Sequence, residues 1–334
     1  MAENSASNGD RSKLPDEHFR LTAPRLALPK GGGAIRGIGE KFTANPVTGT
    51  GSMSVPIYTS PGRSGFGPQL ALSYDSGSGN SPFGFGWSLS LPSITRKTDK
   101  GLPQYADAEE SDIFILSSAE DLVPVLVESN GTWGREAPTP TRTLYGLTYT
   151  IHRYRPCVEG LFARIERWSN ISNPQDTCWR SISKDTITTW YGKTAESRVF
   201  DPTDPTRIFT WHISESSDDK GNVIYYRYKA EDSTGVDLSA AHERNRSDAI
   251  RQAQRYLQYV FYGNRTPYFP DLTAEAPVPL PTDWCFERCS TMAIMTWRTP
   301  FPKSPDCLGT AGLMHSPLTG PLLRCVPIAC AAGR

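Results

Sequence analysis

The sequence predicts a mainly β fold of antiparallel meanders and hairpins, with at most one or two short helices. Three observations favour it. The 334 residues include 28 glycines and 28 prolines, which form tight turns, and 14 tyrosines, 13 phenylalanines and 8 tryptophans, which favour strands. Short runs alternate apolar and polar side chains with a period of two. One segment alone, between Val236 and Tyr256, has a helical composition, with Asp237 as its expected N-cap.

The stretch from Leu28 to Tyr105 predicts a β-meander, because glycine-rich turns separate short alternating runs. The expected strands are 52–57, 70–74 and 87–91. The segment 75–80 begins like a calcium loop, but Gly86 stands where an EF-hand needs a bidentate glutamate. We therefore predict a hairpin turn at this segment, since glycine and asparagine tolerate positive φ.

More strands are expected in the rest of the chain. By pattern, residues 113–116 and 122–127 form a hairpin. Later strands are expected at 147–168, 179–183, 208–213, 223–228 and 256–262. The segment Asp218-Asp219-Lys220-Gly221-Asn222 supplies turn chemistry before the tyrosine-rich strand 223–228.

Two groups of charged residues have both a functional and a structural interpretation. The acidic cluster consists of Asp107, Glu109, Glu110 and Asp112. It suits a metal or a basic partner, but carboxylates that are neighbours on a loop rarely converge on one ion, so a solvated loop is favoured. Arg164 and Arg167 suit an anion site, although charged residues on the wet face of a sheet are the usual case.

No nucleotide-binding loop is expected. The glycines from Gly31 to Gly39 do not complete G-x-G-x-x-G, because Arg36 or Phe42 occupies the sixth position. Gly192-Lys193-Thr194 resembles the end of a Walker A loop, but Ile187 stands where that motif needs its first glycine. The preceding residues indicate a strand, and the sequence therefore predicts no cofactor.

Catalytic and metal motifs are also missing from the sequence. The five histidines, His18, His152, His212, His242 and His315, show no metal spacing, and no G-x-S-x-G elbow is present. Five of the seven cysteines crowd the last 50 or so residues without forming paired C-x-x-C knuckles. We therefore assign no catalytic, cofactor-binding or metal-binding residue, and we expect no enzyme activity.

Charge and hydropathy exclude several classes of partner. Lysine and arginine total 35, as do aspartate and glutamate, which disfavours nucleic acid and anionic membranes. No apolar run is long enough for a membrane-spanning helix. The N-terminus lacks the basic start and apolar block of a secretory signal, so we expect synthesis in the cytoplasm and any extracellular release by a route without a Sec-type signal peptide.

Several long motifs occur in one order along the chain. They are LPKGGGAIRGIGEKF from Leu28, PVTGTGS from Pro46, SPGRSGFGPQLALSYDSGSGN from Ser60 and PFGFGWSLSLPSITRKTDKGLPQY from Pro82. Together with later segments at 154–168, 179–202, 218–232 and 262–284, they resemble the N-terminal domain shared by the Salmonella virulence plasmid B protein and the B components of insecticidal toxin complexes. The resemblance covers about residues 30–287.

This resemblance implies a structural role. In that family the domain forms part of a curved, hollow β shell that, together with the C component, encloses a cytotoxic effector. The implied partners are the C component, the remainder of the B component and, indirectly, the A component. The virulence-plasmid member carries a separate ADP-ribosyltransferase domain, which needs a Glu-x-Glu pair that this chain does not contain. The resemblance therefore implies a non-catalytic segment of a longer toxin.

The domain boundaries follow from these patterns. Residues 1–24 are polar and are expected to be a disordered extension, and residues 25–287 form the β-rich domain. Residues 288–334 contain one acidic residue, Asp306, with four of the seven cysteines and three of the five methionines counted from Cys289. We hypothesise that this tail is not family sequence but an altered reading frame or misassigned gene end, and that the chain is a fragment.

Two other classes of function stay open at this point. A carbohydrate- or protein-binding β-module would expose aromatic side chains, with Phe83, Phe85, Trp87 and Trp133 as candidates. The first three alternate with glycines and are expected on one side of a strand. An unrecognised hydrolase would need a pocket that brings carboxylates or a histidine to a nucleophile.

Overall fold

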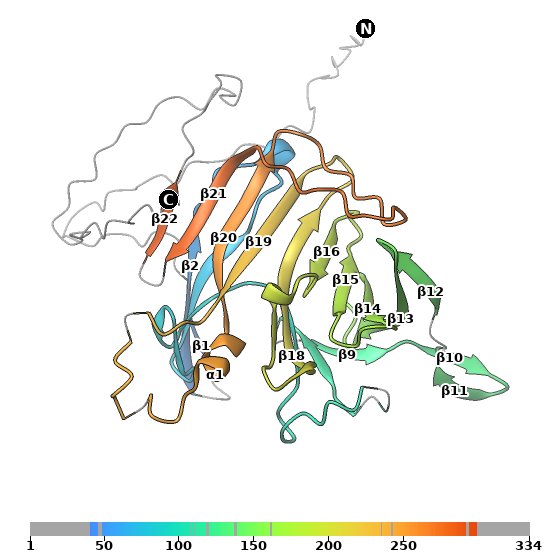
Figure 1. Ribbon diagram of the computed structural model, residues 1–334, viewed down its shortest axis with the longest axis horizontal. Helices are drawn as coiled ribbons and strands as arrows, with labels where there is room; N and C mark the ends of the chain where they lie inside the picture. Colours follow the sequence, from blue (N-terminus) through green and yellow to red (C-terminus); the bar gives the residue numbers. More distant parts are fainter. Residues whose placement is uncertain are drawn as a thin grey trace, which may run out of the picture.

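The computed structural model describes residues 41–298, apart from 46–48, 108, 110, 118–119, 137–138, 161, 235, 242 and 292–293. The expected extension at 1–24 and most of the tail lie outside these residues. Strands dominate the described part, so the predicted mainly β class of antiparallel hairpins and meanders is confirmed (Figure 1).

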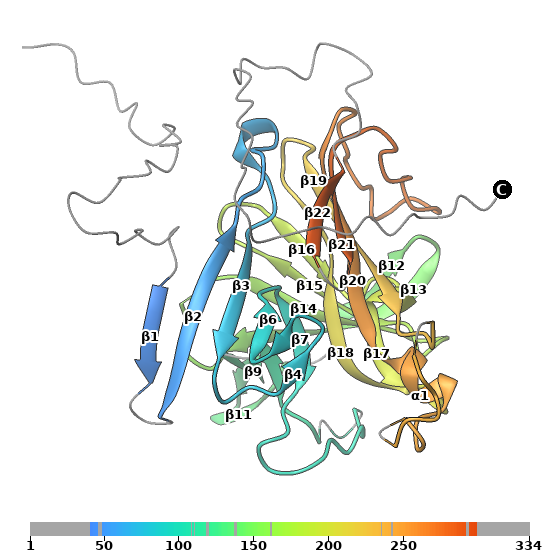
Figure 2. The ribbon, with the colours of Figure 1, turned by 90° about the vertical axis from the view of Figure 1, so that its left-hand side faces the viewer.

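The predicted N-terminal meander is confirmed. β1 (Lys41–Asn45), β2 (Thr50–Ile57), β3 (Leu70–Asp75) and β6 (Trp87–Leu89) form an antiparallel four-stranded sheet in that order. The turn after β3 is closed by the Gly77 N–H, which donates to Asp75 Oδ1 at 2.8 Å. Figure 2 shows β1, β2 and β3 as a layer on one side of the molecule.

The alternation Phe83-x-Phe85-x-Trp87 does not form one strand, contrary to expectation. It spans a tight hairpin, β4 (Asn80–Ser81) and β5 (Gly84–Phe85), followed by β6. Gly84 and Gly86 have φ of 106° and 79°, values that break the strand between successive aromatic residues. The period of two therefore has no common face here.

Eight strands form a closed ring, and β18 completes it. They are β7 (Ser93–Arg96), β8 (Phe114–Leu116), β9 (Glu120–Pro124), β13 (Leu147–Pro156), β14 (Arg164–Asn170), β15 (Thr177–Ile182), β16 (Thr188–Tyr191) and β18 (Asp204–Ser217). β18 pairs with β7 through residues 210–212 and with β16 through residues 213–217. Because every neighbouring pair is antiparallel, the predicted hairpins become the wall of a barrel.

Other strands extend from this ring. β19 (Val223–Ala230), β20 (Arg255–Asn264), β21 (Trp284–Thr291) and β22 (Ile294–Arg298) continue the sheet from β18 as a wing. β12 (Thr139–Leu144) pairs with β13, and β17 (Arg198–Asp201) pairs with β18. The hairpin of β10 (Leu126–Ser129) and β11 (Thr132–Arg135) projects from the barrel at the right of Figure 1.

Aromatic side chains fill the barrel. Trp179 and Trp211 are fully buried, with ring centroids 6.0 Å apart, and Phe114 lies against both. A second core packs Trp168 and Trp190 on the opposite face of β14 and β16, with ring centroids 5.5 Å apart. Since the wall is packed on both faces, the barrel is a core and not an open lumen.

The single α-helix among the described residues lies in the predicted segment but begins later than expected. α1 (Asp248–Ala253) is capped by Ser247, whose hydroxyl accepts from the Ile250 N–H at 3.3 Å. The prediction of Asp237 as N-cap is wrong, because its carboxylate accepts from the Ser239 N–H at 3.0 Å and closes a separate turn.

The sheet crosses the predicted boundary after Glu287. Arg288, the first residue of the expected tail, is 2 % exposed and donates to the Tyr58 carbonyl, which joins β21 to the segment after β2. β22 continues the same sheet by pairing with β21. The reading-frame hypothesis for the tail stays a prediction, but the described structure does not end at residue 287.

Candidate functional site

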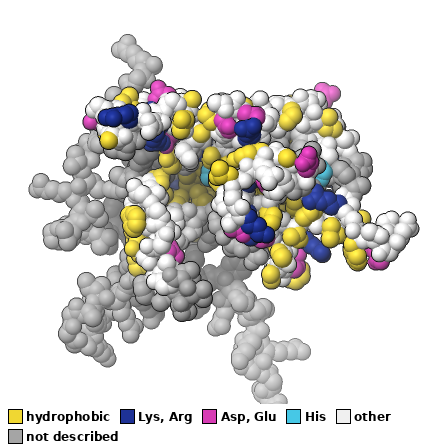
Figure 3. Space-filling model, turned by 90° about the horizontal axis from the view of Figure 1, so that it is seen from below, with side chains coloured by type: hydrophobic (Ala, Val, Ile, Leu, Met, Phe, Trp, Pro, Cys, Tyr) yellow, Lys and Arg dark blue, Asp and Glu magenta, His cyan; other side chains and the backbone are white. Residues whose placement is uncertain are grey.

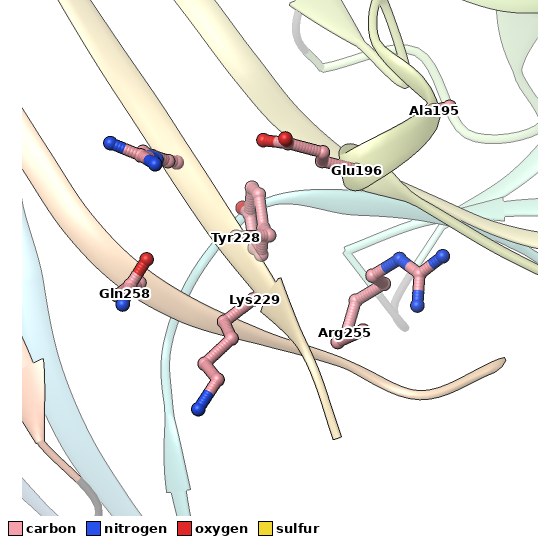
Figure 4. A pocket seen from close by; sticks show the side chains of 8 residues that line it. Ala195, Glu196, Tyr228, Lys229, Arg255 and Gln258 are labelled. Atoms are coloured by element: carbon pink, nitrogen blue, oxygen red, sulfur yellow. The ribbon is translucent and has the colours of Figure 1, made fainter. Parts of the chain in front are cut away.

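A groove of about 350 Å³ lies between β19, β20 and the short turn η2 (Ala195–Ser197). Its walls are Ala195, Glu196, Arg227, Tyr228, Lys229, Ala230, Arg255 and Gln258, most of which are drawn in Figure 4 with labels. Three of these side chains are cations and one is an anion. We call this surface the basic groove.

Local structure explains how these side chains come together. The register of β19 and β20 shifts between Arg227 paired with Tyr259 and Tyr228 paired with Leu257, which leaves Gln258 as the extra residue of a β-bulge. η2 presents Glu196 to the same groove from the far side of β19 (Figure 4). Thr194 and Ser197 fix that turn through their hydroxyls, which lie 3.2 Å apart.

The three cations differ in their surroundings. Arg255 lies over the Phe200 ring at 5.3 Å and donates to the Gln254 carbonyl at 3.2 Å. Burial lowers the pKa of Arg255, and Glu196 partly opposes that shift. Lys229 pairs with Asp232 at 2.5 Å, whereas Arg227 is exposed and lies over the Tyr259 ring at 5.9 Å.

Tyr228 lines the basic groove, and His212 stacks against its ring. The Tyr228 hydroxyl donates to the Ile213 carbonyl at 2.8 Å, and burial holds its pKa well above the usual range. His212 stacks on the Tyr228 ring at 5.0 Å, and burial, assisted by Arg255, lowers the pKa of its imidazole to about 4. Its Nε2 has no hydrogen-bond partner.

The acidic cluster of the sequence binds a cation from the chain itself. Arg96 is 2 % exposed and its Nη1 lies 2.6 Å from Asp107 and 2.7 Å from Asp112. Burial would raise the pKa of Asp112, but the N–H groups of Gln104 and Tyr105, together with Arg96, hold it below its usual value. Two of the four carboxylates therefore pair with a buried guanidinium, Asp112 from inside the protein and Asp107 from a partly exposed position, which corrects the solvated-loop interpretation for these two residues.

The wet-face interpretation holds for Arg164 and is wrong for Arg167. Arg164 is partly exposed and pairs with Glu166 at 2.5 Å. Arg167 points into the barrel, where its guanidinium lies 5.4 Å from the Phe114 ring centroid and 5.8 Å from that of Tyr154. Its Nε has no hydrogen-bond partner. The charge was visible in the sequence, but the inward direction was not.

A second groove, of about 360 Å³, lies over the second core, which contains Trp168 and Trp190. Arg142, Thr143, Trp168, Leu272 and Thr273 surround it. Trp168 is fully buried and forms part of the core described above. This groove lies between β12 and the segment that joins β20 to β21.

The four candidate aromatic residues do not form one surface. Phe85 and Trp133 are 67 % and 65 % exposed, but they belong to different hairpins. Trp87 packs on Tyr74 with ring centroids 5.3 Å apart, and Phe83 is partly buried. The exposed aromatic cluster expected of a carbohydrate-binding module is therefore not assembled from these residues.

Metal-binding and membrane-spanning features were searched within the described ranges. No group of three or more His, Cys, Asp or Glu residues there is placed to hold a metal ion. Cys157 and Cys178 are free thiols, and burial raises the pKa of Cys178 to about 12. No helix in the described ranges has the length and apolar character needed to cross a membrane.

Sequence reasoning missed the basic groove. Arg227 lies on the predicted strand 223–228 and Lys229 follows directly after it, so their spacing of two residues was a usable signal. Arg255 lies on another strand and Glu196 on a turn, and only the pairing of β19 with β20 brings them near. Figure 3 shows small, mixed groups of acidic and basic side chains on the face that it displays.

Comparison with protein families gives a match over most of the chain. The family model described as Salmonella virulence plasmid 65kDa B protein matches residues 45–289. The mono(ADP-ribosyl)transferase SpvB of Salmonella typhimurium strain 14028s is 40 % identical over 246 residues, which cover 72 % of this chain and 38 % of the relative. SpvB of Salmonella dublin gives the same identity and coverage. The chain thus spans less than half the length of these curated relatives.

Solved structures agree with this match. The crystal structure of TcdB2-TccC3 superposes with a TM-score of 0.64 at 34 % identity, covering 80 % of this chain and 12 % of that chain. The N-terminal domain of the effector protein SpvB from Salmonella typhimurium strain LT2 superposes with a TM-score of 0.58 at 34 % identity, covering 74 % and 78 %. The structure of the Photorhabdus luminescens Tc holotoxin pore superposes with a TM-score of 0.62 at 32 % identity, covering 81 % of this chain and 12 % of that chain.

Proposed function

Because this chain belongs to the Salmonella virulence plasmid 65kDa B protein family, we propose that it is a non-catalytic structural segment of a toxin-complex B component. In this proposal it forms part of the hollow shell that encloses a cytotoxic effector. Its partners are the C component and the remainder of the B component, and through them the A component.

One observation supports this role most strongly. Four fifths of the chain superposes on a B–C toxin-complex structure at 34 % identity, and it matches 12 % of that chain. A segment of that size would form only part of the shell and could not enclose an effector by itself. Trp179, Trp211 and Phe114 fill the interior of the barrel, so the described barrel itself does not enclose a cargo.

The described fold also offers surfaces for lateral contacts. The strands β1 and β22 end their sheets, and their outer edges have no strand partner among the described residues. The hairpin β10–β11 is exposed along its length and carries Trp133, Leu126 and Val127 on its surface. Open strand edges and exposed apolar hairpins are typical places for another polypeptide to add to a sheet.

The absence of catalysis is part of the proposal. Burial holds the pKa of Tyr228, which lines the basic groove, well above its usual range, and this supports a binding surface rather than a reaction site. An ADP-ribosyltransferase takes its ADP-ribose from NAD. We expect the chain, incubated with labelled NAD and a cell extract, to transfer no label, while a full-length SpvB as control does. Label transfer by the chain alone would contradict this part.

Release from the producing cell belongs to the same proposal. The relatives include a protein described as an effector and a Tc holotoxin pore. We propose synthesis in the cytoplasm followed by release from the producing cell. Immunodetection in culture supernatant, against a cytoplasmic enzyme as a lysis marker, tests it.

Co-purification tests the structural role. The chain is expressed with a toxin-complex C component and with the remainder of a B component as a separate polypeptide. Stable assembly, seen as one species in size-exclusion chromatography, is the expected result. If the chain aggregates alone while the other two polypeptides assemble without it, the structural proposal is wrong.

A further inference from the structure

We propose that a row of aromatic side chains on one face of the wing is the surface on which the remainder of a B component packs. This aromatic stripe consists of Tyr225 of β19, Tyr259 and Phe261 of β20, and Trp284 of β21. The three strands are neighbours in the wing (Figure 1). The inference rests on the proposed function, because the partner is the one named there, and it adds the place of contact on the face of the sheet.

The four rings of the aromatic stripe form one continuous surface. Tyr225 stands directly opposite Phe261 in the register of β19 and β20, and Tyr259 comes two residues before Phe261 on the same strand. Residues related in these two ways point to the same side of a sheet. The ring centroid of Phe261 lies 6.3 Å from that of Tyr225, 5.6 Å from that of Tyr259 and 5.8 Å from that of Trp284. Phe261 is therefore the centre of the stripe.

The opposite face of β19 and β20 is the one that packs on the core. Ile224 stands opposite Tyr262, and Tyr226 opposite Val260, and all four belong to the core inside the barrel and wing. Neither core of the described residues includes a ring of the aromatic stripe, and each of these rings is partly exposed. An antiparallel sheet with one buried face usually turns polar residues outward. A continuous aromatic row in their place favours a binding surface.

The charged residues beside the aromatic stripe favour a polypeptide as the partner. Arg227 is exposed, and its guanidinium lies 5.9 Å from the Tyr259 ring centroid. Glu287 stands directly opposite Phe261 on β21 and is partly exposed. Within the described residues neither has an ion-pair partner. Tyr, Trp, Phe and Arg are enriched at protein–protein interfaces, and one charge of each sign suits another polypeptide better than a polyanion.

The position of the aromatic stripe selects the remainder of the B component among possible polypeptides. The family model matches residues up to 289, and Cys289 stands directly opposite Tyr259 in the sheet. The chain matches 38 % of SpvB, whose solved relative is an N-terminal domain, so more chain follows this point in that longer family member. Neighbouring strands lie about 5 Å apart. The following chain therefore starts beside the stripe and can pack across it.

The affinity of the full chain for a TcdB2 polypeptide that lacks the matching segment, held in complex with TccC3, tests the proposal. Biolayer interferometry should show saturable binding. Phe261→Gln should weaken it about tenfold, because the variant removes the central ring of the stripe. Arg227→Glu should weaken it as well, and its fold should persist because Arg227 is exposed. Circular dichroism and the urea unfolding midpoint check the fold of both variants.

Phe85→Gln and Lys184→Glu are the matched controls. Phe85 is 67 % exposed on the hairpin β4–β5, and Lys184 is an exposed cation in the turn between β15 and β16. Both should leave the affinity unchanged, and equal weakening by these controls would overturn the proposal.

The remaining outcomes separate this inference from the proposed function. If the unchanged chain and both stripe variants bind equally, the aromatic stripe is not the contact, while the proposed function stands. If not even the unchanged chain binds, both are wrong. A dimer of the chain alone that Phe261→Gln abolishes would overturn the inference in favour of a contact between two copies.

Discussion

At the scale of single residues, several charged side chains are buried and must be paired within the fold. Arg96, Arg167 and Glu166 lie inside a fold whose sequence is formally neutral, and each is less than 4 % exposed. Such groups need partners, because an unpaired charge in a low-dielectric interior is costly. Arg96 meets this need with Asp107 and Asp112, so the acidic cluster is part of the core's own charge balance.

Replacing Arg96 with leucine should destabilise the protein strongly. The substitution removes the cation from Asp112 and leaves Asp107 with the more distant Arg167 at 3.8 Å, and breaking such a buried pair costs about 3–5 kcal/mol. Urea unfolding followed by tryptophan fluorescence measures the loss. Arg207→Leu is the control, since Arg207 is 54 % exposed and pairs with Asp204 at 3.2 Å. Equal losses in the two variants would show that the Arg96 cluster has no special role.

The lowered pKa of His212 predicts a dependence of stability on pH. Its folded-state pKa of about 4 lies below the ordinary value of about 6.5, so between these values the unfolded chain binds a proton that the native protein does not. Stability should therefore fall as pH is lowered through this window.

The variant His212→Phe keeps the ring stack on Tyr228 but cannot take up a proton. Its free energy of unfolding should drop less between about pH 7 and about pH 5 than that of the unchanged protein. Nuclear magnetic resonance titration supplies the direct measurement, with a His212 midpoint near 4. An ordinary midpoint, or an unchanged pH dependence in the variant, would count against this account.

At the scale of elements, glycine fixes places where a strand must stop. Gly192 begins the Gly-Lys-Thr segment that resembles the end of a Walker A loop in the sequence. It has φ of +64° and packs against Trp211. A Cβ at this position would lie 2.3 Å from Trp211 Cδ1. Its role is to let the turn after β16 pass the fully buried Trp211 ring.

Gly192→Ala should therefore cost more stability than positive φ alone explains. Gly131 is the matched control, because its φ is +76° and nothing lies within 4 Å of its Cβ position. We expect Gly131→Ala to cost about 1–2 kcal/mol from the left-handed backbone alone. Gly192→Ala should add roughly 1–3 kcal/mol of overpacking. Similar unfolding free energies for the two variants would show that Trp211 yields easily.

The elements that the sequence predicted correctly are those set by local pattern. The pairing of β8 with β9, and the Asp218-to-Asn222 turn before β19, agree with the expected hairpin and turn. The N-cap of α1 was misplaced, because Asp237 and Ser247 are both good caps, and the structure uses Asp237 to close a separate turn. The prediction that one strand carries Phe83, Phe85 and Trp87 was wrong, because a period of two in the sequence does not reveal the positive φ of the intervening glycines.

At the scale of the whole molecule, contacts between distant segments join the N-terminal sheet to the barrel and its wing. Arg63 Nε donates to Asn222 Oδ1 at 2.7 Å, and Arg288 donates to the Tyr58 carbonyl. These contacts link residues more than 150 positions apart in the chain. Removing the part of β21 that carries Arg288 should therefore lower the stability of the N-terminal segment that it contacts.

A chain that ends at residue 287 should be less stable than one that ends at residue 291. The shorter chain lacks Arg288, whose charged hydrogen bond contributes about 1.5–3 kcal/mol. Urea unfolding compares the two chains, and a third chain, 1–291 with Arg288→Ala, separates the side chain from the end of the strand. Equal stability of all three would place the functional end of the domain at Glu287.

The sequence by itself determined the β class, most strand positions and the family, because side-chain alternation, turn residues and long ordered motifs are local properties. Only the tertiary structure decided the closure of the barrel through β18, the inward direction of Arg167 and the position of Glu196 beside β19 and β20. Each of these depends on which strand lies beside which, and residues far apart in the chain set that pairing.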